Sequence, residues 1–293
     1  MKVLITGANS FVGKNLIKQL KKKKKVKIIG CDLKSNKKLN IIKTNIKNKN
    51  FYNKIKKKID IIIHLAAISR DQDCEKDLSD CYNTNVVGSL NVMHAAEKLS
   101  AKKIIFASTE WVYHNKLARN RADENSILDI SKLKSNYAKS KLLTEYHLKD
   151  FFQKKKIDTI ILRFGIIYGE RKNNWCAVEA LFNSVKKNNN INVGSLKTSR
   201  KFIHVDDICS GIIKSFKLKK FNIINLQGKK LISLKQIIQM ANKILNKDIG
   251  VIQTNPSYPS IRNIKSKNSY KIFFKPQIDL ENGLKRLKRF FNY

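Results

Sequence analysis

The sequence predicts an α/β fold, in which a doubly wound parallel sheet is joined by a smaller, interleaved C-terminal lobe. The first 32 residues read as a β-α-β unit, with an apolar run from Lys2, a turn between Gly7 and Gly13, a helical segment, and a second apolar run ending at Asp32. Apolar runs and helical patterns then alternate along most of the chain, which is typical of a parallel sheet covered by helices on both faces. With 293 residues, 42% of them hydrophobic, the chain can bury the core that this architecture needs.

Each further element is predicted from its own pattern. The strands are expected where apolar, β-branched runs are short and continuous, because such runs are typical of buried parallel strands. The helices are expected where apolar residues recur at helical spacing. On these grounds strands are predicted over 26–30, 40–45, 59–67, 103–109, 159–164 and 221–226, and helices over 11–20, 80–99, 135–152, 174–187, 234–245 and 280–291.

A second lobe is predicted because the strict alternation loosens after about position 168. The chain has three prolines and no Gly/Ser-rich linker, so no clean boundary is marked and the two parts are expected to interleave. We predict that residues 1–168, with about 202–228, form a dinucleotide-binding domain. Residues of about 169–201 and 229–293 are predicted to form the small substrate-binding lobe.

The turn after the first strand is the predicted phosphate site. Unpaired N–H groups and the positive end of the helix dipole favour an anion there. Asp32 ends the second strand about 20 residues later, where a carboxylate can accept both hydroxyls of an adenosine ribose. The pattern therefore predicts a dinucleotide, and NAD rather than NADP, with contacts from Gly7, Asn9, Ser10, Phe11, Val12, Gly13 and Asp32.

Ser10 departs from the usual spacing, because it stands where the middle glycine of G-x-x-G-x-x-G is expected. A side chain there hinders close approach of a pyrophosphate unless the backbone angles are ordinary ones. We predict ordinary angles, with the hydroxyl free to donate a hydrogen bond.

The charge balance is extreme, with 61 Lys and Arg against 22 Asp and Glu and a net charge of +39. The cations are mostly Lys and are spread over the whole chain, which indicates a compositional bias rather than a dedicated nucleic-acid site. We therefore expect no specific nucleic-acid partner, although the charge should attract anionic substrates.

The five cysteines and five histidines form no C-x-x-C or H-E-x-x-H spacing, so neither metal catalysis nor a disulfide framework is expected. The first residues already form a strand, and no apolar run approaches the length that spans a bilayer. The sequence thus predicts no membrane partner and a reduced, cytoplasmic location.

Tyr137 and Lys141 stand at i and i+4, on one face of a predicted helix. A free tyrosine titrates near pH 10, so work as a base near neutral pH requires its pKa to fall by about 3 units through neighbouring positive charge. Lys141 and an oxidised nicotinamide ring could supply that charge.

Several motifs in a fixed order carry a family resemblance. The N-terminal turn and Asp32, His64–Ala67, Asn85–Asn91, Ser108–Tyr113 and the Tyr137/Lys141 pair together resemble the extended short-chain dehydrogenase/reductase family. The resemblance is strongest to its NAD-dependent nucleotide-sugar epimerase/dehydratase branch, and Arg200–Asp207 and 276–283 look like the same branch. It implies a Rossmann-type sheet and covers nearly the whole chain.

The resemblance also implies roles for matching residues. Thr109 would hydrogen-bond the sugar oxygen, Tyr137 would take its proton, and Lys141 would bind the nicotinamide ribose and lower the tyrosine pKa. Asn85, His204 and Asp207 are expected to be structural. The resemblance further implies a homodimer, cofactor contacts from Asn45, Ile46, Leu65, Ala66 and Ala67, and substrate contacts from Thr109, Glu110, Arg200 and Arg262.

Two departures narrow the function. Dehydratases of this branch usually carry two consecutive acids, whereas here Glu110 is followed by Trp111, so dehydration is disfavoured. Gly165 replaces a frequent substrate-binding asparagine. The prediction is an NAD-dependent epimerase that acts at C4 of a nucleotide-diphosphate sugar through a 4-keto intermediate, with transient hydride transfer to NAD. The alternatives are a nucleotide-sugar 4-ketoreductase or dehydrogenase with the same Thr-Tyr-Lys triad, and a non-catalytic basic protein of dinucleotide-binding fold.

Overall fold

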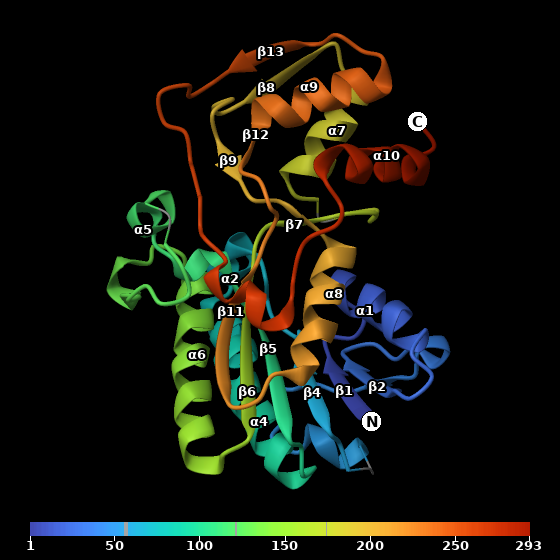
Figure 1. Cartoon of the computed structure of the whole chain (residues 1–293), viewed down its shortest axis with the longest axis vertical. Coiled ribbons are helices and arrows are strands. Elements are labelled where there is room, and N and C mark those ends of the chain that lie inside the picture. The colour runs from blue at the N-terminus through green and yellow to red at the C-terminus, as the bar shows by residue number, and fades with distance from the viewer. Residues whose placement is uncertain (56–57, 121, 174) are drawn as a thin grey trace.

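The computed structural model describes residues 1–55, 58–120, 122–173 and 175–293, apart from the side chains of Lys116 and Leu117. Its centre is a seven-stranded sheet in which every pairing is parallel. The strands are β1 (Lys2–Thr6), β2 (Lys27–Asp32), β3 (Ile41–Lys43), β4 (Ile61–His64), β5 (Lys103–Thr109), β6 (Asp158–Phe164) and β11 (Phe221–Leu226). Their order across the sheet is β11-β6-β5-β4-β1-β2-β3 (Figure 1).

Helices cover both faces of the sheet, as predicted for a doubly wound fold. Val3 and Ile5 point to the face covered by α1 (Phe11–Lys21) and α8 (Val205–Lys214). Leu4 points to the opposite face, where it packs in one cluster with residues of α4 (Gly88–Lys98) and α6 (Asn136–Lys155). Because consecutive strand residues alternate between faces, the continuous apolar run Val3–Ile5 contributes to two separate cores.

The carboxyl ends of the strands form the edge on which the site is built. The strand order reverses at β1, which has β2 on one side and β4 on the other, so Thr6 lies beside both Cys31 and His64. A crevice opens at such a reversal, because the connections on either side of it leave in opposite directions.

The small lobe lies above this edge in Figure 1. Its helices are α7 (Ala177–Lys187), α9 (Leu234–Leu245) and α10 (Leu280–Phe291), and its own core is centred on Phe182, Ile237 and Leu284. Short strand pairs complete it: β8 (Asn190–Val193) with β13 (Gly250–Gln253), and β9 (Ser199–Arg200) with β12 (Ile232–Ser233). β7 (Ile167–Tyr168) and β10 (Ile203–His204) pair where the chain passes between the seven-stranded domain and the small lobe. The boundaries at 168, 202 and 228 stay predictions.

The predicted helix over 80–99 is interrupted. The chain forms α3 (Leu78–Tyr82), a π-helical turn (Asn83–Val87) and then α4. A π turn inserts one extra residue and is frequent at functional sites, and here it contains Asn85. The predicted helix over 174–187 is observed as α7 from Ala177, and position 174 lies outside the described residues.

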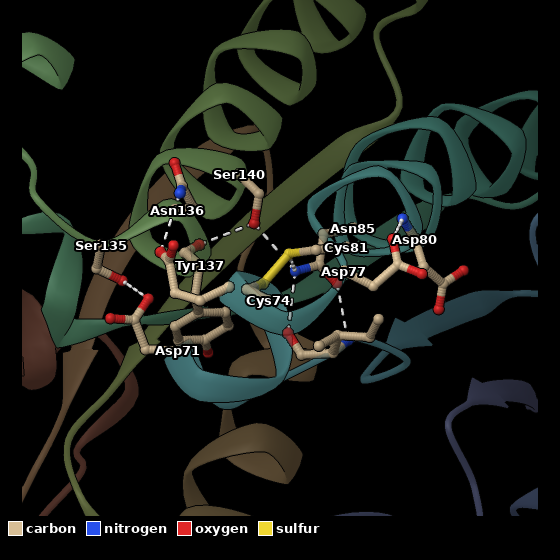
Figure 2. Close-up of a disulfide and its surroundings, with 12 residues drawn as sticks. Asp71, Cys74, Asp77, Asp80, Cys81, Asn85, Ser135, Asn136, Tyr137 and Ser140 are labelled. Atoms are coloured by element: carbon tan, nitrogen blue, oxygen red, sulfur yellow. Dashed lines mark hydrogen bonds between the residues drawn. A yellow bond between two sulfur atoms is a disulfide. The ribbon is translucent and has the colours of Figure 1, made fainter.

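The expectation that the cysteines form no disulfides is wrong for one pair. Cys74 in α2 (Asp71–Lys76) and Cys81 in α3 are bridged, with their Cα atoms 5.0 Å apart (Figure 2). Asp77 separates the two short helices and caps the second, since its carboxylate accepts a hydrogen bond from the backbone N–H of Asp80. This turn brings together two cysteines whose seven-residue spacing matches no familiar motif.

Within the described ranges, no helix combines the length and apolar character needed to cross a membrane.

Candidate active site

The turn between β1 and α1 requires both of its glycines. Gly7 has a φ of +68°, and a Cβ on it would lie 2.6 Å from the backbone nitrogen of Ala66. A Cβ on Gly13 would lie 2.6 Å from the carbonyl oxygen of Gly7. The turn is therefore a cradle of backbone that side chains at these two positions would fill.

Ser10 has the ordinary backbone angles that were predicted, with φ −62° and ψ 167°. It is the N-cap of α1, and its hydroxyl accepts a hydrogen bond of 3.0 Å from the N–H of Gly13. The serine thus replaces a glycine without strain. Donation from its hydroxyl to a bound group stays a prediction.

A cavity of about 390 Å³ opens in front of this turn, within the range of small-molecule sites. The ion pair Lys47–Asp80 and Thr84, which belong to none of the predicted motifs, also line it. Most of the predicted cofactor residues line it: Gly7, Asn9, Ser10, Asp32, Asn45, Ile46, Leu65, Ala66 and Ala67.

Asp32 is held in place on the wall of this cavity. One carboxylate oxygen accepts a 2.8 Å hydrogen bond from the N–H of Asn9, and the other accepts a 2.8 Å bond from the N–H of Leu33. These bonds fix the side chain at the end of β2, where the ribose of a dinucleotide on the Gly7–Gly13 turn would lie.

A second cavity of about 500 Å³ contains the predicted catalytic residues. Thr109, Tyr137 and Lys141 line it together with Phe11 and Val12. The two cavities share wall residues, so they form neighbouring parts of one cleft along the sheet edge. The shared residues are Ser10, Leu65 and Ala67.

The triad residues interact across the interface between α6 and β5. The Tyr137 hydroxyl is hydrogen-bonded to Thr109, and Lys141 Nζ donates a 2.9 Å bond to the Ala107 carbonyl while lying 4.7 Å from the centre of the Phe106 ring. Lys141 is 3% exposed. The tyrosine, threonine and lysine predicted from separate motifs therefore converge on one spot.

Burial opposes the charged forms of both acid–base groups. It raises the pKa of Tyr137 to about 12, against a smaller lowering by the Thr109 hydrogen bond. It lowers the pKa of Lys141 to about 7, against the attraction of Glu145. A tyrosinate near neutral pH thus requires positive charge beyond what the chain supplies at this point, such as that of an oxidised nicotinamide ring.

Asn85 connects the cleft wall to α6, as expected of a structural residue. Its side-chain oxygen accepts from the N–H of Ile68, and its amide donates to the Ile68 carbonyl and to Ser140 Oγ on α6 (Figure 2). The carboxylate of Asp207 likewise accepts only backbone N–H groups, from Gln277 and Ile278, among the bonds of the described residues.

The second predicted structural residue, His204, is fully buried. Its Nε2 lies 3.0 Å from the Glu170 carboxylate, and its Nδ1 accepts from the N–H of Asp206 at the start of α8. Asn85, His204 and Asp207 therefore all have the structural hydrogen bonds that were expected.

The predicted substrate residues Glu110, Arg200 and Arg262 surround Trp111 rather than opening into the cleft. The guanidinium groups of Arg262 and Arg200 lie 4.7 Å and 5.9 Å from the indole ring, and only Trp111 of these residues lines the cavity. Arg200 donates to the Ser260 carbonyl and hydroxyl. The structure thus brings the two arginines together, while their contact with a substrate stays a prediction.

Arg262 and Glu110 form a buried pair. Arg262 is 1% exposed, donates to the carbonyl oxygens of Glu110 and Tyr113 and to Asn115 Oδ1, and its Nε lies 3.6 Å from the Glu110 carboxylate. Burial raises the pKa of Glu110 and the nearby arginines oppose that rise. A role of Glu110 in substrate binding stays a prediction too.

The remaining cavity wall was not foreseen. It comes from α2, which carries Asp73, and from loops with no motif, which carry Arg70, Arg171, Trp175 and Cys176. The structure also explains the absence of an asparagine at Gly165, because a Cβ there would lie 2.9 Å from Gln227 Cβ and 3.0 Å from the Lys201 carbonyl oxygen. Trp111 could have been suspected from the sequence, since it replaces an acid beside Glu110.

Comparisons with known proteins place the chain in a family. A family model described as "NAD dependent epimerase/dehydratase family" matches residues 3–226. A dTDP-D-glucose 4,6-dehydratase of Dictyostelium discoideum is 27% identical over 71% of this chain, and the match spans 54% of that protein's own length. A UDP-glucuronate 4-epimerase of Thermodesulfobacterium geofontis is 26% identical over 78% of this chain and 71% of its own.

Among solved structures, a UDP-glucose 4-epimerase of Thermotoga maritima, determined with UDP-glucose, superposes with a TM-score of 0.89. The match covers 100% of this chain and 99% of the other at 21% identity. At that identity the likeness supports the fold, including the position of the small lobe over the sheet edge.

Proposed function

Because this chain belongs to the NAD dependent epimerase/dehydratase family, we propose that it is a nucleotide-sugar epimerase acting at C4 of the sugar. The observation that carries the proposal is the meeting of Thr109, Tyr137 and Lys141 in a cleft continuous with the dinucleotide turn. These groups can remove a proton from a sugar hydroxyl and return it.

The chain's residues fit NAD. The Gly7–Gly13 cradle leaves backbone room for a pyrophosphate, and Asp32 is fixed where a ribose would lie. When bound, NAD supplies a reversible acceptor for a hydride from the sugar carbon.

The protein's part in the reaction is proton transfer and orientation. Thr109 holds the reacting oxygen against Tyr137, which accepts its proton as the carbonyl of a 4-keto sugar forms. After the ketone turns over in the cleft, Tyr137 returns the proton. Lys141 stabilises the tyrosinate through its charge.

Epimerisation is favoured over dehydration by the residues beside the triad. Trp111 stands where dehydratases of the resembling branch carry a second acid, and Glu110 is buried against Arg262 rather than lining the cavity. A group placed to abstract a proton from C5 is thus missing among the predicted catalytic residues.

The test is conversion of UDP-, GDP- and dTDP-sugars by the purified enzyme, followed by separation of the epimers. Tyr137→Phe keeps the ring and removes the hydroxyl, so turnover should fall at least about 100-fold with unchanged melting temperature. Retention of full turnover by this variant would contradict the mechanism. Stoichiometric appearance or loss of NADH absorbance would instead favour the ketoreductase or dehydrogenase.

A homodimer and a cytoplasmic location are part of the same proposal. Support for the dimer comes from exposed apolar side chains on α3, the π turn, α4 and α6, where Leu78 is 47%, Val87 43%, Leu90 40% and Tyr146 47% exposed. Exposed apolar residues on neighbouring helices are typical of subunit interfaces.

A further inference from the structure

A buried charged pair lies directly behind the catalytic lysine. Glu145 follows Lys141 by one helical turn on α6, and it is 4% exposed. Arg163 on β6, 3% exposed, donates from Nε to both carboxylate oxygens at 3.0 and 3.2 Å and from Nη2 at 2.6 Å. None of the predicted motifs includes this pair.

The pair is fixed to the strand that carries Thr109. Ser108 Oγ donates to Glu145 Oε1, and Arg163 Nη1 donates to the Tyr113 hydroxyl at 2.8 Å. Three successive residues of β5 therefore contact three successive turns of α6: Thr109 with Tyr137, Ala107 with Lys141, and Ser108 with Glu145. Glu145 thus belongs to the same β5–α6 interface that holds Thr109, Tyr137 and Lys141.

The surroundings of Lys141 leave Glu145 as its main counter-charge. Burial strongly disfavours the ammonium, and Glu145 is the charge that opposes this effect. His64 on β4 is a basic group that feels the Lys141 charge, and burial together with that charge lowers its pKa to about 3, so it is neutral near pH 7. The other ionisable groups on the cavity wall are Tyr137 from α6, Asp73 from α2, Arg70 from the loop before α2, and Arg171 and Cys176 from the loop after β7.

We propose that Glu145 is a positioning residue for catalysis: clamped by Arg163 and Ser108, it keeps Lys141 in its charged form and in contact with the cofactor cleft. The inference rests on the proposed role of Lys141 but not on the identity of the sugar. A carboxylate so held raises the fraction of protonated lysine at neutral pH.

The test uses the affinity of the protein for NAD, measured by calorimetry between about pH 6 and pH 9. A protonated Lys141 should bind the nicotinamide ribose better, so affinity should fall as pH rises through the lysine pKa. Lys141→Met should remove this step and thereby identify it. Glu145→Gln should move its midpoint to lower pH by about one unit, because the neutral amide no longer stabilises the ammonium.

Matched variants distinguish a specific effect of Glu145 on the protonation of Lys141 from a general loss of structure. Asp150→Asn removes a carboxylate from the same helix, where it pairs at the surface with Lys154, and should leave the midpoint unchanged. Glu145→Asp retains the carboxylate charge, so its midpoint should lie close to that of the unmodified protein. If Glu145→Gln does not fold, the double variant Glu145→Gln/Arg163→Met also removes the guanidinium that the first substitution leaves without its carboxylate, and its midpoint should still lie below that of the unmodified protein.

An unchanged midpoint in a folded Glu145→Gln or double variant would overturn the proposal, as would an equal shift in Asp150→Asn. Because NAD binding requires no sugar, a failed epimerisation assay together with a shifted midpoint would refute the proposed function and leave this inference standing.

Discussion

The side chain of Asp32 is the group to which we assign the choice of cofactor. Both of its oxygens accept backbone N–H groups, so the carboxylate cannot easily turn away from a ribose phosphate. We predict at least about tenfold tighter binding of NAD than of NADP, because like charges repel in the cleft. Asp32→Asn should remove most of that preference in calorimetric titrations.

A matched control for that variant is Asp60→Asn. Asp60 also accepts a backbone bond, from the N–H of Lys2, but lies at the opposite edge of the sheet, so its loss should leave the preference intact. Tighter binding of NADP by the unmodified protein would show that the interpretation of Asp32 is wrong.

Tyr137 and Lys141 show that a residue pattern can predict the position of two side chains but not their pKa values. Their i, i+4 spacing predicted a shared helix face, and the structure places both in one cavity. Spacing could not predict their burial, which raises the pKa of Tyr137 to about 12 instead of lowering it. The pKa of a side chain depends on neighbours that come from other elements, and the spacing of residues along the chain does not identify those neighbours.

Among the elements, the disulfide-linked pair α2–α3 connects both parts of the cleft. Asp73 lines the catalytic cavity, Asp80 lines the cofactor cavity, and α2 is tied to the start of α6 by the Ser135–Asp71 and Asn136–Glu75 hydrogen bonds (Figure 2). Loosening this element should therefore affect both stability and cofactor binding.

We predict that reducing the Cys74–Cys81 bridge lowers the free energy of unfolding by about 2–3 kcal/mol, the chain-entropy value for a loop of this size. Urea unfolding with and without dithiothreitol measures it. The Cys74→Ser/Cys81→Ser variant should match the reduced protein, whereas Cys176→Ser should respond to reductant like the unmodified chain. Detection of five free thiols in the untreated, unfolded protein would contradict the bridge.

The π turn at Asn83–Val87 illustrates a limit of periodicity. The apolar spacing over 80–99 predicted one helix, and the chain is indeed helical there, but a π-helical turn interrupts it over Asn83–Val87. The inserted turn directs the Asn85 amide toward Ile68 and Ser140. Those partners come from a loop and another helix, so the local sequence alone does not predict the π turn.

At the scale of the whole molecule, the charge and the exposed apolar residues act in opposite directions. A net charge of +39 on each chain opposes self-association, whereas the apolar side chains on α4 and α6 favour it. The proposed dimer should therefore be stabilised as salt screens the repulsion.

Light scattering across a salt series tests this balance. Leu90→Glu should convert the dimer to a folded monomer, because a carboxylate would be buried at the interface. Ile252→Glu is the matched control, since Ile252 is 57% exposed on β13 of the small lobe, apart from these helices, and its substitution should not change the mass. A monomer at every salt concentration would refute the dimer.

The sequence by itself determined the alternation of strands and helices, the glycine turn with Asp32 at the end of the second strand, and the position of Tyr137 and Lys141 on one helix face. These features are local, because strand burial, tight turns and helix faces are encoded in short patterns. Ser10 is the clearest case, since its ordinary angles follow from its place at the first turn of α1.

The tertiary structure alone decided how distant segments meet. It paired Cys74 with Cys81, turned Glu110 and Arg262 toward each other behind Trp111, and set Glu145 and Arg163 behind Lys141. Each depends on how separate elements pack, whether they are neighbours in the chain, as α2 and α3 are, or far apart, as Glu110 and Arg262 are. Burial and the nearest charge then govern the chemistry of each group. The tertiary structure alone also decided which residues of the small lobe line the cleft, because they come from loops in which the sequence shows no motif.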